Sequence, residues 1–445
     1  MGQDHPGRPH HAAVNAGEAG RMKSPNQLSA LEAARAIEAG TLTSEALVRA
    51  CLDRIAERNL DVLAFTATDH ELALRHARHA DQQTGGVLRG IPFAVKDVIE
   101  TRDYETAYGS PIYLGHRPRV DAGSVARACE NGAVLLGKVA TSEFATQTPS
   151  NTRNPHDLRH TPGGSSSGSA AAVADCMVPV AFGTQTTASI VRPASYCGVV
   201  GYKPTFGFIG TAGLKPLSPT QDTIGLLTRT VEDAAFFAFG LHGARVADRD
   251  DLSPRLAICR SGQWEHARPE MIDAVERVAR EAQRHGAVVR TITLPREIED
   301  LYDLQARLFA FEARQSLAHE RLHDSDKFSE RLKQRLAGGL GITPDEYLTM
   351  RRRAALARAQ LASLFDGVDA LLYPPAQGEA DAGLADSGSP RFGALWSLLH
   401  VPCVSFPVTR GPQGLPIGVQ AIGAHGDDAR LLAIAAFLAR VAADR

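Results

Sequence analysis

Three consecutive serines stand between glycines in the stretch TPGGSSSGSAAAVA, residues 161–174. Such a stretch is either a flexible linker or a loop in which a hydroxyl does chemistry. A linker would continue in Gly and Ser, whereas this stretch runs directly into alanine-rich, helix-like residues. A glycine-rich turn that enters a helix offers backbone N–H groups and the positive end of the helix dipole. The stretch is therefore a place where a serine oxygen or an oxyanion can be held.

A second hydroxyl for such chemistry comes from Ser189, in the segment GTQTTASIVRPASYCGVVGYKPT, residues 183–205. Its neighbours are small or hydroxylic, and small neighbours let backbone N–H groups approach a substrate carbonyl closely, as an oxyanion hole requires. Ser189 follows Ser165 by 24 residues. That separation allows a helix and a strand to bring both hydroxyls to one edge of a sheet.

A lysine in an apolar setting supplies the third group. Lys96 lies in GIPFAVKDVIE, residues 90–100. The bland interpretation is a lysine at a strand end whose ammonium group reaches solvent. The functional interpretation is a buried amine, because burial disfavours the charged form and lowers the pKa of a lysine. A neutral lysine can serve as general base for a serine.

Two other motifs need to be considered for the serine-rich stretch. GSSSG fits G-x-S-x-G with Ser166 in the middle, the pattern of the α/β-hydrolase nucleophile elbow. That motif requires a strand directly before it, but residues 151–162 (NTRNPHDLRHTP) are rich in turn formers. The histidines that such a triad would need, His400 and His425, have no distinctive setting. A phosphate-binding loop is excluded, because no Gly-Lys-Ser/Thr follows.

Alternating strands and helices must position these groups. Thr43 is a typical N-cap for the helix that follows it. Apolar runs typical of strands occur at 62–67, 91–99, 133–140, 178–182, 255–260, 287–294, 402–408 and 416–423. Helical patterns in the second half occupy residues 268–285, 347–365 and 427–443. This order is typical of an α/β protein with helices layered on a mostly parallel or mixed sheet.

Composition limits the class of protein. The chain has 445 residues, of which 44% are hydrophobic and 22% charged, with a net charge of −2. These values are typical of a soluble globular protein and do not suggest nucleic acid as a partner. The six cysteines include no C-x-x-C pair, which favours a reduced, cytoplasmic protein. No apolar run reaches the roughly 18 residues of a membrane span. Residues 1–24 are polar and predict a disordered tail.

Five segments in this order resemble the amidase signature family of serine hydrolases. They are GIPFAVKD (90–97), GSVARACENGAVLLGKVATSEFA (123–145), NPHDLRHTPGGSSSGSAAAVA (154–174), residues 183–205, and DTIGLLTRTVEDA (222–234). The resemblance is strong over residues 25–240 and weaker towards the C-terminus. It implies one amidase domain over residues 25–445, an α/β/α-layered fold with a large mixed β-sheet covered by helices.

The resemblance also implies a Ser–cis-Ser–Lys triad. At the matching positions Ser189 would be the nucleophile, Ser165 the bridging residue preceded by a cis peptide bond, and Lys96 the base. Ser166 would belong to the supporting hydrogen-bond network. No metal or organic cofactor is implied. The backbone amides expected to line the oxyanion hole are those of Thr186, Thr187, Ala188 and Ser189.

The chain departs from the family pattern in two places. Most members have Asp-Thr-Gly-Gly-Ser where this chain has Gln-Thr-Thr-Ala-Ser, residues 185–189. Side chains at positions 187 and 188 restrict the backbone more than two glycines would. Secondly, Arg192 stands three residues after Ser189 rather than two, as in malonamidase-type members, where the corresponding arginine holds a substrate carboxylate. Arg192 can bind a carboxylate through two parallel hydrogen bonds; a structural role before Pro193 is the alternative.

The expected function is an amidohydrolase that cleaves the C–N bond of a small carboxamide through an acyl-enzyme, with carboxylate-bearing or urea-like amides as narrower options. One alternative is a glutaminase or transamidase subunit of an amidotransferase, although the near-neutral charge gives no support for an RNA surface. Another is a catalytically silent member that acts as a binding protein. A homodimer is common in the family. Candidates for the pocket walls, for each of which core packing is the alternative, are Tyr302, Phe309, Phe311, Trp396 and Leu398.

Overall fold

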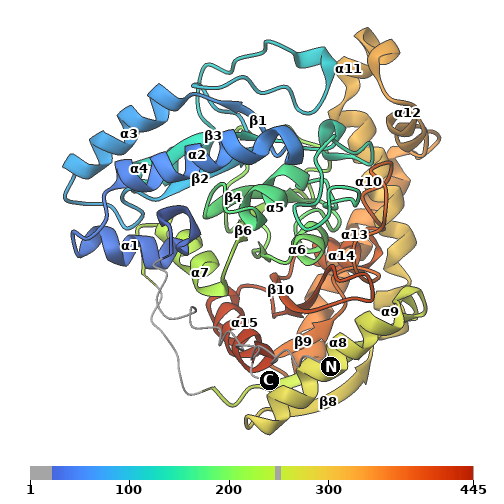
Figure 1. Ribbon diagram of the computed structural model, residues 1–445. Coiled ribbons are helices and arrows are strands. Elements are labelled where there is room, and N and C mark those ends of the chain that lie inside the picture. Colours follow the sequence, from blue (N-terminus) through green and yellow to red (C-terminus); the bar gives the residue numbers. More distant parts are fainter. Residues whose placement is uncertain (1–22, 246–251, 444–445) are drawn as a thin grey trace, which may run out of the picture.

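Strands from both halves of the chain join in one mixed sheet of 11 strands (Figure 1). The computed structural model describes residues 23–245 and 252–443. Within these residues no helix is long and apolar enough to cross a membrane. In spatial order the strands are β1 (Phe65–Thr68), β3 (Val134–Val139), β2 (Pro92–Lys96), β4 (Val180–Gln185), β6 (Thr223–Thr228), β5 (Val200–Lys203), β10 (Cys403–Arg410), β11 (Pro416–Ile422), β9 (Ala370–Tyr373), β7 (Arg255–Arg260) and β8 (Val288–Thr293).

The sheet combines two parallel regions with antiparallel joints. β2 lies between β3 and β4 and is parallel to both. β7 lies between β8 and β9 and is likewise parallel to both. The strands between these regions, from β4 through β6, β5, β10 and β11 to β9, pair antiparallel. The predicted α/β class with a mixed sheet is therefore confirmed.

Helices cover both faces of the sheet. They are α1 (Ala30–Glu38), α2 (Ser44–Val62), α3 (His70–Gln82), α4 (Gly123–Glu130), α5 (Ser167–Ala174), α6 (Val191–Cys197), α7 (Val231–Gly240), α8 (Pro269–Arg284), α9 (Arg296–Glu299), α10 (Leu301–Ser316), α11 (Ala318–His323), α12 (Glu330–Ala337), α13 (Pro344–Gln360), α14 (Arg391–Leu398) and α15 (Asp428–Ala443). Phe182 of β4 packs against Phe237 of α7. The next residue, Gly183, faces Ser166 at the start of α5. Successive side chains point to opposite faces, so α5 and α7 cover opposite faces.

The small residues of α5 let its backbone lie unusually close to the sheet. Every residue of the helix except Ala174 is buried. A Cβ atom on Gly168 would lie 2.3 Å from the Ala140 nitrogen and 2.5 Å from the Ala64 carbonyl oxygen, so a larger residue would push the helix outward. This close packing explains the run of Ser, Gly and Ala in the sequence. It brings the serine-rich turn before α5 against the ends of β2, β3 and β4.

Several elements predicted from the sequence occur as expected. Thr43 caps α2, and its side chain accepts a hydrogen bond from the Ala46 N–H at 3.1 Å. The two strands expected at 402–408 and 416–423 form the antiparallel pair β10 and β11. Of the predicted N-terminal tail, residues 1–22 lie outside the described residues, and the first 3-10 turn begins at Pro25.

Candidate active site

Lys96 is the last residue of β2 and is fully buried, with an exposed fraction of 0%. Its Nζ is hydrogen-bonded to the Ser165 hydroxyl at 2.7 Å and to the Thr184 hydroxyl at 2.8 Å. Burial lowers the pKa of Lys96 well below its ordinary value, and the positive charge of Arg192 adds to this effect, whereas the nearby Asp222 carboxylate opposes it. The arrangement favours a neutral amine in contact with two hydroxyls.

Ser165 lies in the turn that enters α5 and follows a cis peptide bond, Gly164–Ser165. This geometry agrees with the expectation drawn from the family resemblance. The Ser165 carbonyl accepts a hydrogen bond from the Ser142 N–H at 3.2 Å. The backbone is therefore tied to the segment after β3, while the side chain faces Lys96.

Ser189 lies in the loop between β4 and α6, next to the serine-rich turn. Its carbonyl accepts a hydrogen bond from the Ser166 N–H at 3.3 Å. The side chain lines a cavity of about 630 Å³. Among the described residues, the Ser189 hydroxyl has no hydrogen-bond partner, Ser165 included. Ser189 thus presents a free hydroxyl to the cavity, and the hydrogen-bonded chain from Lys96 ends at Ser165. Catalytic hydrogen bonds are often long before substrate binds.

The loop before Ser189 is held by its side chains and carbonyls. The Thr186 hydroxyl donates to Asp222 at 2.6 Å, and the Thr187 carbonyl accepts from the Ser397 hydroxyl at 2.9 Å. The N–H groups of Thr187, Ala188 and Ser189 have no acceptor in the described part of the chain. Unpaired N–H groups beside a free hydroxyl can stabilise an oxyanion formed there.

Asp222 fixes the start of this loop through hydrogen bonds to Thr186 and to the segment 217–218. One carboxylate oxygen accepts from Thr186, and the other accepts from the N–H groups of Leu217 and Ser218 at 2.8 and 2.9 Å. Burial raises the pKa of Asp222, while these hydrogen bonds lower it. The carboxylate therefore holds the start of the loop in place.

Two arginines face the same cavity with unused N–H groups. Arg192 is 4% exposed; its Nη2 donates to the Gly164 carbonyl at 2.5 Å, but Nε and Nη1 have no partner. Arg335 of α12 lies over the Phe309 ring at 4.2 Å, and its Nε is buried and also unpaired. Burial lowers the pKa of both guanidinium groups. Neither forms an ion pair within the described residues, so the cavity can hold an anionic group.

The rest of the cavity lining carries charges of both signs. Asp386 lies 3.9 Å from Arg331 of α12, and Asp381 forms an ion pair with Arg268. Both acids belong to the loop between β9 and α14, as do Gln377 and residues 387–390, which also line the cavity. The polar stretch 377–390 is thus part of the site wall.

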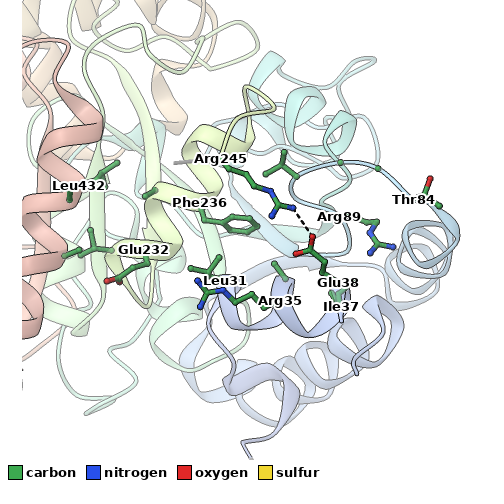
Figure 2. Close-up of a pocket in the computed structure, with 18 of the residues that line it drawn as sticks. Leu31, Arg35, Ile37, Glu38, Thr84, Arg89, Glu232, Phe236, Arg245 and Leu432 are labelled. Carbon is green, nitrogen blue, oxygen red and sulfur yellow. Dashed lines mark hydrogen bonds and ion pairs between the residues drawn. The ribbon is translucent and has the colours of Figure 1, made fainter. Parts of the chain in front are cut away.

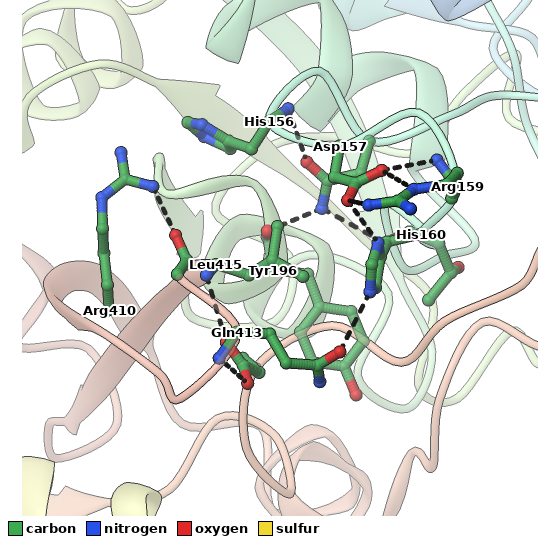
Figure 3. Close-up of polar contacts among 12 residues, drawn as sticks. His156, Asp157, Arg159, His160, Tyr196, Arg410, Gln413 and Leu415 are labelled. Atoms are coloured by element: carbon green, nitrogen blue, oxygen red, sulfur yellow. Dashed lines mark hydrogen bonds and ion pairs between the residues drawn. The ribbon is translucent and has the colours of Figure 1, made fainter.

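The segment before Ser165 is fixed by polar contacts (Figure 3). The Asn154 side chain donates to the carbonyls of Tyr196 and Thr161 at 2.9 and 3.3 Å. The His160 ring lies between Asp157 and Gln413, whose side chains are 3.3 and 3.4 Å from its nitrogens. These contacts hold the serine-rich turn against α6 and against the hairpin between β10 and β11.

A second and larger cavity lies elsewhere. It measures about 730 Å³ and is lined by residues of α1, α7, α15 and the segment 84–89 (Figure 2). None of the residues predicted to do chemistry lines it. The smaller cavity is therefore the candidate active site, because it contains Ser189, Arg192 and the loop with unpaired N–H groups. No group of three or more His, Cys, Asp or Glu residues that could hold a metal occurs within 23–245 and 252–443.

The surroundings of Ser166 and His400 do not form a nucleophile elbow or its triad. No strand leads into Ser166, since residues 155–166 contain no strand, which argues against a nucleophile elbow. His400 stacks on Phe206 and bonds the Thr220 carbonyl, and burial lowers its pKa to about 3. Of the five pocket-wall candidates only Phe309 lines the cavity; Trp396 and Leu398 are core residues.

Thr184 and Arg335 were not found from the sequence. Thr184 immediately precedes the Gln-Thr-Thr-Ala-Ser loop, residues 185–189, and its hydroxyl near the end of the buried strand β4 was the available indication. Arg335 lies 146 residues after Ser189 in a helix with no distinctive local pattern.

Ser166 supports the site without touching the cavity. Its hydroxyl donates to the Thr184 carbonyl at 3.2 Å and accepts from the Thr184 N–H at 3.2 Å. Replacing Ser166 by alanine should reduce kcat for amide cleavage by roughly 10-fold, about the effect of one hydrogen bond, because Thr184 then holds Lys96 less firmly. Steady-state kinetics on the purified variant measure this effect. A loss as large as that for Ser189→Ala would mean that Ser166 itself takes part in the reaction.

Known proteins match this chain along most of its length. The family model Amidase matches residues 46–432. A glutamyl-tRNA(Gln) amidotransferase subunit from Oleidesulfovibrio alaskensis is 32% identical over 91% of this chain and 95% of its own length. The corresponding proteins of Acidobacterium capsulatum and a Cyanothece strain are 31% and 30% identical over 91% and 86% of this chain, and over 97% and 91% of their own lengths.

Solved structures of known proteins also match this chain along most of its length. A crystal structure described as an amidase has a TM-score of 0.83 and 30% identity, covering 92% of this chain and 99% of its own. A protein described within an unexpected vestigial complex that reveals the origins of an s-triazine catabolic enzyme has a TM-score of 0.84 and 26% identity, covering 93% and 98%. The narrower likeness to malonamidase-type members stays a prediction. The chain belongs to the amidase signature family.

Proposed function

We propose that this protein cleaves the C–N bond of a primary carboxamide and releases ammonia, with Ser189 as nucleophile, Ser165 as proton bridge and Lys96 as base. The observation that carries the proposal is the fully buried Lys96, hydrogen-bonded at 2.7 Å to the hydroxyl of Ser165, together with the free hydroxyl of Ser189, which lines the cavity. A lysine whose pKa is lowered by burial can accept a proton at neutral pH.

The proposed reaction proceeds through an acyl-enzyme. The Ser189 oxygen attacks the amide carbon while its proton passes to Ser165, whose own proton passes to Lys96. The oxyanion forms beside the N–H groups of Thr187, Ala188 and Ser189, which have no other acceptor among the described residues. The relayed proton then goes to the leaving nitrogen, the C–N bond breaks and ammonia departs. Water attacks the ester by the same relay, which releases the carboxylic acid and restores Ser189.

We propose further that the acyl part of the substrate carries a carboxylate. Two guanidinium groups, those of Arg192 and Arg335, line the cavity with buried N–H groups that lack partners. A buried donor without a partner is costly, and a carboxylate fits the paired N–H groups of arginine. Glutamine is the first substrate to test, because the curated relatives are glutamyl-tRNA(Gln) amidotransferase subunits.

The relatives favour a component of an amidotransferase over an independent hydrolase of small amides. In that role the chain would supply ammonia to a protein partner. An independent hydrolase is the second candidate, and the peptide amidase of Stenotrophomonas maltophilia, with a TM-score of 0.78 and 27% identity, supports it. All proposed reacting groups lie within one chain, so either role is compatible with turnover by the purified protein.

The test is ammonia release from a panel of amides by the purified chain, with Ser189→Ala as control. The panel contains glutamine, asparagine, malonamate and the neutral propionamide. We expect kcat/KM for the carboxylated amides to exceed that for propionamide by roughly 10- to 100-fold, the effect of one or two charge-assisted hydrogen bonds. Equal values would refute the carboxylate proposal. No release from any amide by a folded protein would refute the amidase proposal, and preference for malonamate over glutamine would favour the independent hydrolase.

Arg192 offers a direct test of substrate class. Replacing it by alanine should raise KM for glutamine or malonamate by roughly 10- to 100-fold while changing KM for propionamide by less than about 3-fold. The reason is that only the carboxylated amides can use its free Nε and Nη1. Michaelis constants for both classes measure the difference. An equal rise for neutral amides would assign Arg192 to holding the Gly164 carbonyl alone.

A further inference from the structure

α14 packs directly behind the loop that carries Ser189. A Cβ atom on Gly393 would lie 2.7 Å from both the Ala188 Cβ and the Thr187 carbonyl oxygen, and 2.8 Å from the Ala188 Cα. Two of these three atoms belong to the loop backbone, so no side-chain rotation can relieve the contact. Only glycine lets the helix approach the loop this closely.

Ser397 adds a polar contact from the same helix. It lies four residues after Gly393, and residues i and i+4 share a helix face. Its hydroxyl donates to the Thr187 carbonyl at 2.9 Å and accepts from the Gln185 side-chain nitrogen at 3.1 Å. The Gln185 oxygen in turn accepts from the N–H groups of Ile190 and Val191 at 3.0 and 3.1 Å. The loop is thus fixed on both sides of Ser189.

The Thr187 carbonyl matters because it shares a peptide plane with the Ala188 N–H. The peptide bond is planar and trans, so the C=O and N–H of one unit point in opposite directions. A carbonyl held by Ser397 therefore directs the Ala188 N–H away from α14. Thr187 and Ser189, on either side of that N–H, line the cavity.

We propose that α14 sets the geometry of the oxyanion hole, with Gly393 and Ser397 as positioning residues for the Ala188 N–H and the Ser189 hydroxyl. Neither residue lines the cavity, so neither touches the substrate. The proposal rests on the proposed function of Ser189. It also explains how this loop can carry side chains at positions 187 and 188, where most family members have glycine. The loop is held by α14, a helix that follows about 200 residues later in the chain.

The test compares Gly393→Ala and Ser397→Ala with matched controls. Gly123→Ala, at the start of α4, places its Cβ no closer than 3.9 Å to a neighbour. Ser363→Ala removes an exposed hydroxyl that bonds only the Gln360 carbonyl. Each protein is assayed for kcat and KM with the best amide of the panel, for the rate of covalent labelling by a fluorophosphonate, and for thermal unfolding. The fluorophosphonate forms an O–P bond with the serine oxygen and loses fluoride, so it reports the nucleophile independently of the amide substrate.

We expect Gly393→Ala to lower kcat and the labelling rate by roughly 100-fold, the effect of losing one oxyanion donor, with KM within about 3-fold of wild type. Ser397→Ala should lower both rates by roughly 10-fold. The controls should match wild type. If Gly393→Ala does not fold, Ser397→Ala decides the question alone.

Each negative result has a different meaning. Wild-type rates in folded Gly393→Ala and Ser397→Ala would overturn the proposal and leave the amidase function intact. Lower rates with a proportional rise in KM would also overturn it, because they would indicate a disturbed substrate cavity. A wild-type protein that is neither labelled nor active would refute the proposed function itself.

Discussion

Replacing Ser189 by alanine should lower kcat for ammonia release by roughly 10⁴- to 10⁶-fold, the range found when a nucleophile of a catalytic triad is removed. Ser189 presents the free hydroxyl of the cavity, beside the N–H groups that can stabilise an oxyanion. Alanine keeps the loop conformation, since the Ser189 hydroxyl makes no hydrogen bond within the described residues. Coupled ammonia detection and fluorophosphonate labelling measure the loss.

Thermal unfolding provides the control for this substitution. Because no hydrogen bond is lost, the melting temperature of Ser189→Ala should stay within about 2 °C of wild type, the shift that a few tenths of a kcal/mol would cause. The binding of glutamine, measured by calorimetry, should persist, because Arg192 and Arg335 are unchanged. Ammonia release at the wild-type rate would show that Ser189 is not the nucleophile.

The groups proposed to react were recognisable because each lies in an unusual local setting. Lys96 interrupts an apolar run of the sequence, Ser165 opens a run of small residues, and Ser189 follows a loop of small and hydroxylic residues. The structure brings Lys96 and Ser165 into contact and places Ser189 next to the serine-rich turn, where its carbonyl accepts a hydrogen bond from the Ser166 N–H. The order of strands and helices was also readable, because buried strands such as β3 and β4 give apolar runs bounded by polar residues.

Two kinds of feature could not be predicted from the sequence: some short strands, and residues whose role depends on contacts between distant segments. β5 and β9 have only four residues each, too few for a periodic pattern. Arg335 reaches the cavity because α12 lies beside the loop 377–390, and no local pattern encodes that. Gly393 lies within α14, where helix propensity alone disfavours glycine; only its contact with Ala188 explains it.

Lys138 provides a matched control for replacing Lys96, the substitution with the second largest expected effect. Both are buried lysines on the neighbouring parallel strands β2 and β3. The Lys138 Nζ donates hydrogen bonds to the Ile99 carbonyl at 2.5 Å and to the Thr106 hydroxyl at 2.7 Å, and it lies 3.5 Å from the Asp97 carboxylate. Burial lowers its pKa to about 8. It touches neither serine, so Lys138→Met controls for the loss of a buried amine as such.

Replacing Lys96 by methionine should lower kcat by roughly 10³- to 10⁴-fold, because the relay loses its base while the nucleophile and oxyanion donors stay. Lys138→Met should lower the melting temperature, since Asp97 is left buried without its cation. Turnover per folded molecule of that variant should stay within about 3-fold of wild type, a change that corresponds to less than 1 kcal/mol. Equal losses in the two variants would assign Lys96 a structural role only.

The pH dependence of the wild-type enzyme should carry the signature of this lysine. The base must be neutral, so kcat/KM should rise as pH increases through the pKa of the coupled relay and fall as pH decreases below it. Burial lowers the pKa of Lys96, so this ascending limb should lie below the pKa of an ordinary lysine, roughly 10.4.

Arg192 contributes to the lowering of the Lys96 pKa. In Arg192→Gln the ascending limb should therefore move to higher pH. The rates are measured with a neutral amide from about pH 5 to about pH 10. Because a neutral amide does not use Arg192 for binding, a shift of the limb then reports the pKa of the relay and not a change in substrate binding. A limb that is unchanged in Arg192→Gln, or that persists in Lys96→Met at the wild-type rate, would show that another group supplies the base.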